Sequence, residues 1–227
     1  MSLILQVRNL KKYFPIERGM LRRARGWVKA IDGISLNVKE ATTLGIVGRS
    51  GSGKTTLAKL LLRLIPPTSG EIIYNPELIT NFRKDVQIIF QNPYQSLNPK
   101  MCILEILTEP LIIHHLANKE DSAGMVLDSL ESVGLDSSVL SRLPAEFSGG
   151  QRQRICLARS LLLHPKFLIL DEPISSLDLT RQVEIMDLLK SLKSRFNLTY
   201  IFITHNLNLL KEISDSILVI DKGRIIR

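Results

Sequence analysis

The sequence has few cysteines, few aromatic residues and no long apolar run, and each scarcity argues against a class of protein. Cys102 and Cys156 have no C-x-x-C partner and no paired histidines, so neither a disulfide framework nor a zinc site has support. No apolar run reaches the roughly 18 residues of a transmembrane helix, and residues 1–10 lack the layout of a signal peptide. We therefore expect a cytosolic chain with reduced, packed thiols.

Acidic residues are also in short supply, because 22 Asp and Glu face 30 Lys and Arg and give a formal net charge of +8. This charge suits nucleic acid, anionic lipid headgroups or nucleotide phosphates, and does not choose among them. Aromatic residues make up 5% of the chain and form no basic, aromatic-rich stripe that would favour RNA or DNA. With 227 residues, of which 44% are hydrophobic, the chain is long enough to bury the core of one large domain or two small ones.

The most specific pattern is a glycine-rich loop that fits the P-loop motif G-x-x-x-x-G-K-[ST]. Residues 43–47 before it predict a buried strand, and residues 57–64 after it predict a helix that ends before Pro66-Pro67. Glycines let the backbone fold around an anion, and the amides at the helix start point toward that anion. Lys54 supplies a charge for the β- and γ-phosphates, and the Thr55 hydroxyl is placed to ligate Mg²⁺. The residues of the loop are Gly48, Arg49, Ser50, Gly51, Ser52, Gly53, Lys54, Thr55 and Thr56.

Strand and helix patterns alternate along most of the chain, which predicts an α/β fold with a mostly parallel sheet. The start differs, because two short strands predict an antiparallel β region. The basic stretch between them, from Glu17 to Lys29, predicts a solvated loop, with a phosphate- or membrane-facing patch as the alternative. Residues 92–143 contain three prolines and helical spacings, which predict an inserted helical subdomain. The expected strands are 3–7, 34–38, 43–47, 71–74, 86–90, 167–172, 200–205 and 217–220, and the other main helices are near 103–107, 126–133, 152–163 and 179–195.

Polar residues follow directly on several apolar strands, where ligands gather in parallel sheets. Asp171 ends one strand and would hold the Mg²⁺ ligated by Thr55, while Glu172 would position the water that attacks the γ-phosphate. Gln91 and His205 end two others and could meet the γ-phosphate, its water or the metal. The alternatives are an ordinary helix cap for Asp171 and satisfied structural roles for Gln91 and His205.

A second candidate anion site is formed by Ser148, Gly149, Gly150 and Gln151, which precede a helical pattern at 152–163. A chain with one nucleotide pocket has no evident use for a second loop of this kind. The loop therefore predicts that this chain completes the pocket of another copy.

These motifs, in their order and spacing, resemble those of the ATP-binding subunits of ABC transporters, and the resemblance covers almost the whole chain. The signature sequence LSGGQ is present with Phe147 in place of leucine. By this resemblance Phe14 matches the aromatic residue that stacks on adenine, although the residue alone would suit the core. Gln91 matches the Q-loop glutamine, Asp178 closes the D-loop after 175–177, and His205 matches the switch histidine.

Finer phrases resemble the branch that imports dipeptides, oligopeptides and nickel. They are a basic insertion before residues 28–33, then 89–93 and 96–99. Two features depart from that branch, because the segment between Tyr74 and Val86 is short and the usual C-terminal extension after Arg227 is missing.

The resemblance implies a single ABC ATPase domain over residues 1–227, with an ATPase core of 1–91 and 144–227 and a helical subdomain of 92–143. It implies ATP and Mg²⁺ as cofactors, a second ATP-binding subunit and transmembrane permease subunits as partners, a peripheral location at the cytoplasmic face of the membrane, and no nucleic acid. The substrate would be peptides or nickel. A soluble ABC ATPase that acts on nucleic acid or ribosomes is the alternative, although such proteins usually carry two cassettes or a long coiled coil. A degenerate regulatory subunit is a third, and the intact Glu172 and His205 argue against it.

Overall fold

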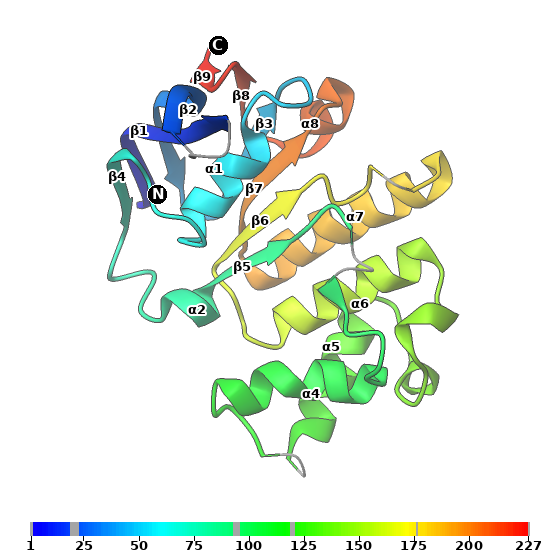
Figure 1. Ribbon diagram of the computed structural model, residues 1–227. Helices are drawn as coiled ribbons and strands as arrows, with labels where there is room; N and C mark the ends of the chain where they lie inside the picture. The colour runs from blue at the N-terminus through cyan, green and yellow to red at the C-terminus, as the bar shows by residue number, and fades with distance from the viewer. Residues whose placement is uncertain (1, 19–22, 93–95, 119–120, 176, 227) are drawn as a thin grey trace. The chain divides into compact units, whose positions relative to one another are not determined.

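The structure is a computed structural model, and it describes residues 2–18, 23–92, 96–118, 121–175 and 177–226. The chain divides into two compact units (Figure 1). The first contains residues 1–80 and 201–227, and the second contains residues 81–200. The expected division into an ATPase core and a helical subdomain stays a prediction.

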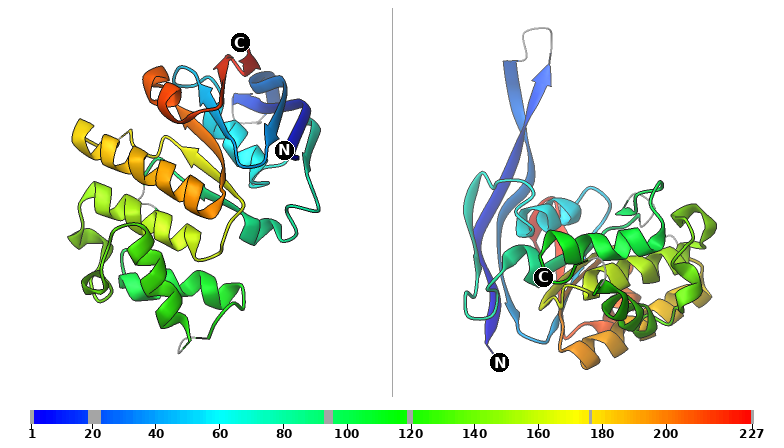
Figure 2. Two further views of the ribbon diagram at one scale, coloured as in Figure 1. Left: turned by 180° about the vertical axis from the view of Figure 1, so that it is seen from behind. Right: turned by 90° about the horizontal axis from the view of Figure 1, so that it is seen from below.

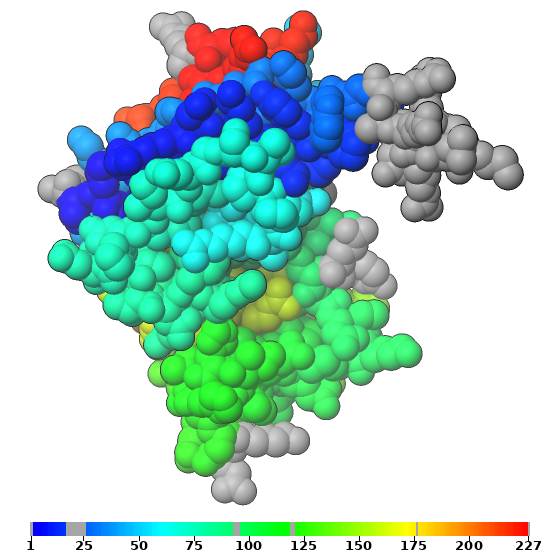
Figure 3. Space-filling model, turned by 60° about the vertical axis from the view of Figure 1, so that its left-hand side comes forward, coloured from blue at the N-terminus to red at the C-terminus, as the bar shows by residue number. Residues whose placement is uncertain are grey.

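An antiparallel sheet dominates the start of the first unit, as expected. Its strands are β1 (Leu3–Arg18), β2 (Arg23–Lys39) and β4 (Ser69–Tyr74), in the order β2-β1-β4. Alternating apolar residues of β1 and β2, among them Leu5, Leu10, Ile34 and Val38, are buried and fix which face of the sheet covers the core. In the space-filling view the blue and cyan surface comes from this sheet and the neighbouring helix α1 (Figure 3).

The expectation that the basic stretch is a loop was wrong for residues 17–18 and 23–29, which lie in strands, while residues 19–22 lie outside the described residues. β1 and β2 are much longer than the predicted strands 3–7 and 34–38, and they stay paired as far as Arg18 and Arg23. We call the paired segments 11–18 and 23–32 the arm. Pairing between the two strands satisfies backbone amides along this arm, and aromatic and β-branched residues such as Phe14 opposite Val28 favour strands. The right-hand view of Figure 2 shows the two strands running out together as an arm.

The second part of the first unit is a parallel strand pair with its flanking elements. β3 (Thr43–Val47) is fully buried, as its apolar run predicts, and pairs in parallel with β8 (Ser216–Asp221). β9 (Arg224–Ile225) returns antiparallel to β8. The strand order in this unit is β7-β3-β8-β9, where residues 201–204 of β7 (Thr199–Thr204) belong to the unit. Helix α1 (Lys54–Leu61) follows β3, and α8 (Leu207–Ile213) follows β7.

The second unit contains a parallel strand pair and most of the helices. β5 (Val86–Ile89), preceded by the short α2 (Phe82–Asp85), pairs in parallel with β6 (Phe167–Asp171). β6 is fully buried, whereas Gln87 and Ile88 in β5 are half-buried. The helices are α4 (Ile103–Ile113), α5 (Ser122–Ser132), α6 (Gly149–Leu161) and α7 (Leu179–Phe196), with single 3₁₀ turns at Ser137–Val139 and Pro144–Glu146.

Helices α4, α5 and α6 contact one another, and each contributes buried apolar residues, among them Leu107, Val126, Leu130 and Leu157. Cys156 is buried in α6, Cys102 is half-buried before α4, and both thiols are free. No helix in the described part of the chain combines the length and apolarity needed to cross a bilayer.

Candidate functional site

The P-loop connects β3 to α1, as the motif predicts, and two of its glycines, Gly48 and Gly53, lie close to backbone carbonyls of neighbouring strands. Gly53 is the N-cap of α1 with φ 107°, a conformation that L side chains rarely adopt. A Cβ atom at Gly53 would lie 2.3 Å from the carbonyl oxygen of Ala30 on β2. A side chain at this position would therefore push the loop away from the sheet beneath it.

Two polar side chains inside the loop suit a bound phosphate. The Lys54 side chain is buried, and its Nζ donates hydrogen bonds to the carbonyls of Gly48 at 2.8 Å and Arg49 at 3.0 Å. The Ser52 hydroxyl oxygen is buried and makes no hydrogen bond to any of the described residues. Such a group costs about 1–3 kcal/mol until a ligand or water satisfies it. The loop thus holds a buried cation, Lys54, and an unsatisfied hydroxyl, Ser52, beside the helix N-terminus, and both groups can bind a phosphate.

The other predicted loop residues are accessible to a ligand. Ser50, Gly51 and Thr55 are exposed, and Thr56 is half-buried in the first turn of α1. That turn carries no acidic residue that would repel phosphate.

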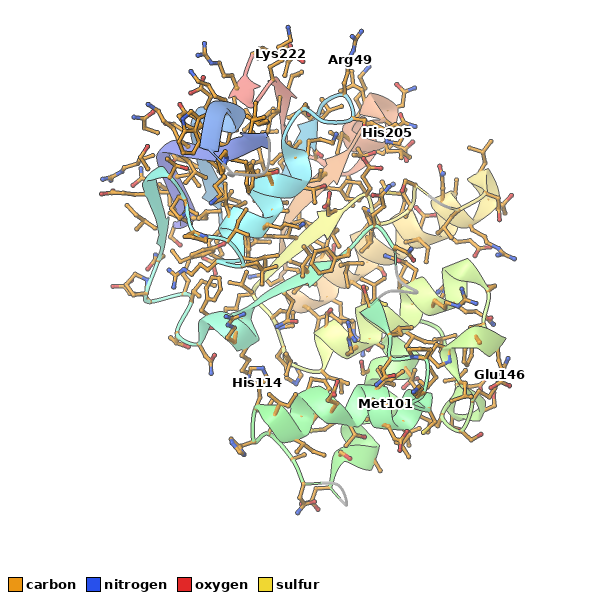
Figure 4. All side chains as sticks on the ribbon, in the orientation of Figure 1. Arg49, Met101, His114, Glu146, His205 and Lys222 are labelled. Atoms are coloured by element: carbon orange, nitrogen blue, oxygen red, sulfur yellow. The ribbon has the colours of Figure 1, made fainter. Side chains whose placement is uncertain are left out.

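His205 follows β7 and lies beside the P-loop. It lines a cleft of about 490 Å³ together with Gly48 and Arg49 of the loop and Asp221 at the end of β8. Figure 4 shows Arg49 and His205 at the same end of the first unit. The structure thus brings His205 to the P-loop as the strand-end argument predicts. Asp221 also ends a strand, so the same argument could have found it, but the sequence reasoning missed it and gave Arg49 no role beyond its place in the loop.

Phe14 lies on the arm, where β1 pairs it with Val28 of β2. Its side chain is 39% exposed, so the alternative that Phe14 belongs to the core was wrong. The Nζ atom of Lys12 lies 5.1 Å from the centroid of the ring. An accessible ring beside a cation offers a flat surface on which a nucleobase can stack.

In the second unit the structure brings Gln91 and Glu172 together. β5 and β6 are parallel neighbours, so the residues after them meet, and Gln91 Nε2 donates a hydrogen bond of 3.4 Å to Glu172 Oε2. Asp171 is buried at the end of β6. Glu172 has φ 50°, in the left-handed region that is uncommon for residues other than glycine. Backbone strain of this kind is often found at functional sites.

The second predicted anion loop begins α6 with a reciprocal cap. Ser148 is the N-cap, its Oγ accepts from Gln151 N at 3.3 Å, and Gln151 Oε1 accepts from Ser148 N at 3.0 Å. A Cβ atom at Gly149 would meet Leu177 at 3.3 Å, and one at Gly150 would meet Arg181 at 3.5 Å. The loop therefore lies against the start of α7.

Asp178 is the N-cap of α7, where Oδ1 accepts from Arg181 N at 3.0 Å. Oδ2 also forms an ion pair of 3.3 Å with Arg181 Nε. Of the D-loop residues before it, Ser176 lies outside the described residues.

Comparison with known proteins agrees with this geometry. The family model described as ABC transporter matches residues 31–175. The chain is 43% identical over 230 residues to the oligopeptide transport ATP-binding protein AppF of Bacillus subtilis, covering 97% of this chain and 70% of that protein. It is 41% identical to the dipeptide transport ATP-binding protein DppF of Escherichia coli, covering 97% and 68%. It spans only 42% of the peptidoglycan transport ATP-binding protein YejF of Agrobacterium fabrum, to which it is 41% identical.

A solved dimer of the ATP-binding cassette MJ0796 in a post-hydrolysis state, bound to ADP and Pi, superposes with a TM-score of 0.83. It is 28% identical, and the match covers 98% of this chain and 97% of that one. Fold and site together define a P-loop ATPase. The chain belongs to the ABC transporter family, and it is an ATP-binding subunit that hydrolyses ATP. The resemblance, the α/β fold and the ATPase activity expected from the sequence are thereby confirmed.

Proposed function

We propose that this ATPase energises the import of peptides through separate membrane subunits. The observation that carries the proposal is 41–44% identity, across nearly the whole chain, to ATP-binding proteins of oligopeptide and dipeptide transport. A 42% identical relative in Shigella boydii is a glutathione import ATP-binding protein, and glutathione is itself a small peptide. Nickel, the other solute expected from the resemblance, is not among the solutes named for these relatives.

The P-loop binds the triphosphate of ATP in this account. Lys54 Nζ donates to the loop carbonyls of Gly48 and Arg49. An ammonium group has three N–H donors, so when ATP binds it redirects them to the β- and γ-phosphates. The Ser52 hydroxyl supplies a further donor, and the exposed Ser50, Gly51 and Thr55 lie where the phosphates enter. Charge-assisted hydrogen bonds of this kind are roughly twice as strong as neutral ones, so they account for most of the phosphate affinity.

The residues that would ligate Mg²⁺ through their side-chain oxygens are Thr55, Asp171 and Gln91. Hydroxyl, carboxylate and amide oxygens are hard ligands that suit this ion. No cluster of three or more His, Cys, Asp or Glu side chains suited to a metal occurs among the described residues, and Mg²⁺ typically uses only one or two carboxylates plus phosphates. When bound, Mg²⁺ neutralises charge that develops on the transferring phosphoryl group.

Glu172 polarises the attacking water, and Gln91 and His205 orient it and the γ-phosphate. The hydrogen bond from Gln91 holds the Glu172 carboxylate in one orientation, and a carboxylate within hydrogen-bond reach of water can accept its proton. His205 lies beside Gly48 in the cleft, where an imidazole N–H can donate to a phosphate oxygen.

Two ATP-binding subunits close head to tail, so that the loop Ser148, Gly149, Gly150 and Gln151 of each completes the pocket of the other, with Asp178 at the junction. The dimeric state of the solved MJ0796 cassette supports the presence of a second ATP-binding subunit. The short apolar stretch of α4, with Leu104, Ile112 and Ile113 exposed, offers a surface for a permease subunit, which would hold the chain at the cytoplasmic face of the membrane.

The test compares Lys54→Ala with Lys59→Ala, since both residues lie on α1 and Lys59 is exposed away from the loop motif. Cells carrying each variant as their sole copy are assayed for uptake of labelled dipeptides, labelled oligopeptides and ⁶³Ni²⁺. We expect Lys54→Ala to abolish peptide uptake and leave nickel uptake intact, with Lys59→Ala close to wild type. Normal peptide uptake in Lys54→Ala, together with co-purified RNA or ribosomes, would instead support the soluble, non-transport alternative.

A further inference from the structure

A half-buried carboxylate, Asp32, joins three parts of the first unit that the ATPase motifs do not include: β1, β2 and β9. The Asp32 side chain, 10% exposed, lies on β2. Its Oδ1 accepts a hydrogen bond of 2.5 Å from the hydroxyl of Tyr13 on β1. Its Oδ2 accepts from Arg224 on β9, from Nε at 3.0 Å and from Nη2 at 2.7 Å. One side chain therefore ties the arm to the end of the chain.

The turn that carries Arg224 also contacts the P-loop. Lys222 and Gly223 connect β8 to β9 with φ of 45° and 76°, as in a tight two-residue hairpin turn. Gly223 N donates to the carbonyl of Ser52 at 2.9 Å, and the carbonyl of Gly223 accepts from Asp32 N at 2.8 Å. The backbone of one residue thus links the phosphate loop to the strand that carries Asp32.

The same three segments are packed without spare room. A Cβ atom at Gly223 would lie 2.7 Å from the carbonyl oxygen of Ala30, which is the atom that also closes off Gly53 in the P-loop. The turn and the P-loop thus pack against the same carbonyl of β2.

Tyr13 is the residue before Phe14, so its hydroxyl fixes the strand that presents the ring. Neighbouring residues in a strand point to opposite faces, and anchoring Tyr13 to Asp32 sets how β1 is rotated about its own axis at Phe14. A series of contacts therefore runs from the P-loop at Ser52, through Gly223 and Asp32, to Tyr13, the residue before Phe14.

We propose that Asp32, Tyr13 and Arg224 are positioning residues for the nucleotide, which set the distance between the Phe14 ring and the P-loop so that base and phosphates of one ATP bind together. The proposal rests on the proposed role of Phe14 in binding the base. Holding both ends in place before binding reduces the ordering cost of a ligand that spans them. The three residues touch neither the base nor the phosphates themselves.

The charges around Asp32 keep it ionised. The hydrogen bonds from Tyr13 and Arg224, and the charge of Lys29, hold the pKa of the Asp32 carboxyl below its usual range. The ion pair between Arg8 and Glu71 on the same sheet makes a useful contrast, because both side chains are more than half exposed and the atoms are 3.9 Å apart. Such exposed pairs contribute little, so Arg8 serves as a control.

The experiment measures binding of ATP and of tripolyphosphate by calorimetry in EDTA, with thermal melting of each variant alongside. Tripolyphosphate keeps the phosphates and lacks the base. We expect Tyr13→Phe and Arg224→Gln each to weaken ATP about 3- to 10-fold, a range common for coupled neighbours, with less than two-fold change for tripolyphosphate. Arg8→Gln should leave both affinities unchanged. In a Phe14→Ala background, Tyr13→Phe should cause no further loss of ATP affinity, because its effect acts through the ring.

Three results would overturn the proposal. One is equal loss of ATP and tripolyphosphate affinity in Tyr13→Phe, which indicates a general effect on the loop. Another is full additivity of Tyr13→Phe with Phe14→Ala, which indicates independent actions. The third is an unchanged ratio of ATP to tripolyphosphate affinity in Phe14→Ala itself, which removes the proposed role of the ring and is distinguishable from the first two. If Arg224→Gln lowers the melting temperature, the affinities of Tyr13→Phe alone test the proposal, because that substitution deletes only a hydroxyl.

Discussion

Replacing Gly53 by alanine should separate backbone strain from packing in the P-loop, because Gly51 provides a matched control. Both glycines have positive φ, 107° at Gly53 and 76° at Gly51. A Cβ atom at Gly53 would meet the Ala30 carbonyl oxygen at 2.3 Å, whereas one at Gly51 has no heavy atom within 4 Å. The two substitutions therefore share a conformational penalty and differ in the clash.

The magnitudes follow from these distances. A positive φ costs an alanine about 1–2 kcal/mol, which both variants incur. Forcing a methyl group against a backbone oxygen adds about 1–3 kcal/mol at Gly53 alone, as in other overpacked sites. We expect Gly51→Ala to lower the free energy of unfolding by about 1–2 kcal/mol and Gly53→Ala to lower it by about 2–5 kcal/mol.

Thermal melting of the purified chain measures the difference, since 1 kcal/mol corresponds to about 2–4 °C for a protein of this size. Gly124→Ala is a positive control, because this glycine lies in α5 with open space around its Cβ position and its replacement should stabilise by about 0.4–1 kcal/mol. Equal melting temperatures for Gly51→Ala and Gly53→Ala would refute the packing of Ala30 against the loop.

Three further outcomes are expected. Lys54→Ala should reduce ATP affinity at least ten-fold in equilibrium binding, because a charge-assisted contact of about 1.5–3 kcal/mol is lost; wild-type affinity would remove Lys54 from the phosphate site. Burial raises the pKa of the Cys156 thiol to about 11, so iodoacetamide at pH 8 should leave Cys156 unmodified until denaturant is added, and rapid labelling of the native chain would contradict its burial. Because the Asp32 pKa is depressed in the folded chain, its contribution to stability should be complete above about pH 4 and be lost as the pH falls further. Urea titrations from pH 7 to pH 3 should therefore lose less stability in Arg224→Gln than in wild type.

The sequence predicted those parts of the fold that depend on local pattern. The apolar runs before the P-loop and before Asp171 form β3 and β6, and both strands are fully buried. A strand that is covered on both faces has a continuous apolar sequence, so the local pattern is enough to predict it. Polar residues that follow parallel strands were expected to lie near one another. In the structure His205 lies beside the P-loop and Gln91 lies beside Glu172.

The parts that the sequence did not predict depend on pairing between distant residues. Charge patterning suggested a loop over residues 17–29, but charge does not prevent strand formation when a neighbouring strand supplies hydrogen bonds, as the pairing of β1 with β2 shows. Asp32 and Arg224 are 192 residues apart, so no local spacing could connect them. Gly223 carries a visible turn signal in the sequence, but its contact with Ser52 depends on the parallel pairing of β3 with β8.

The most direct test of the account is the oligomeric state of Glu172→Gln by size-exclusion chromatography with light scattering in Mg-ATP. The amide keeps the shape of Glu172 and loses the charge that polarises water, so ATP stays bound and the closed pair accumulates. We predict a dimer for Glu172→Gln, and a monomer when Ser148→Arg is added, because the added bulk and charge block the partner's γ-phosphate. A Glu172→Gln chain that binds ATP and still stays monomeric, both alone and mixed with a partner ATP-binding subunit, would contradict the shared site.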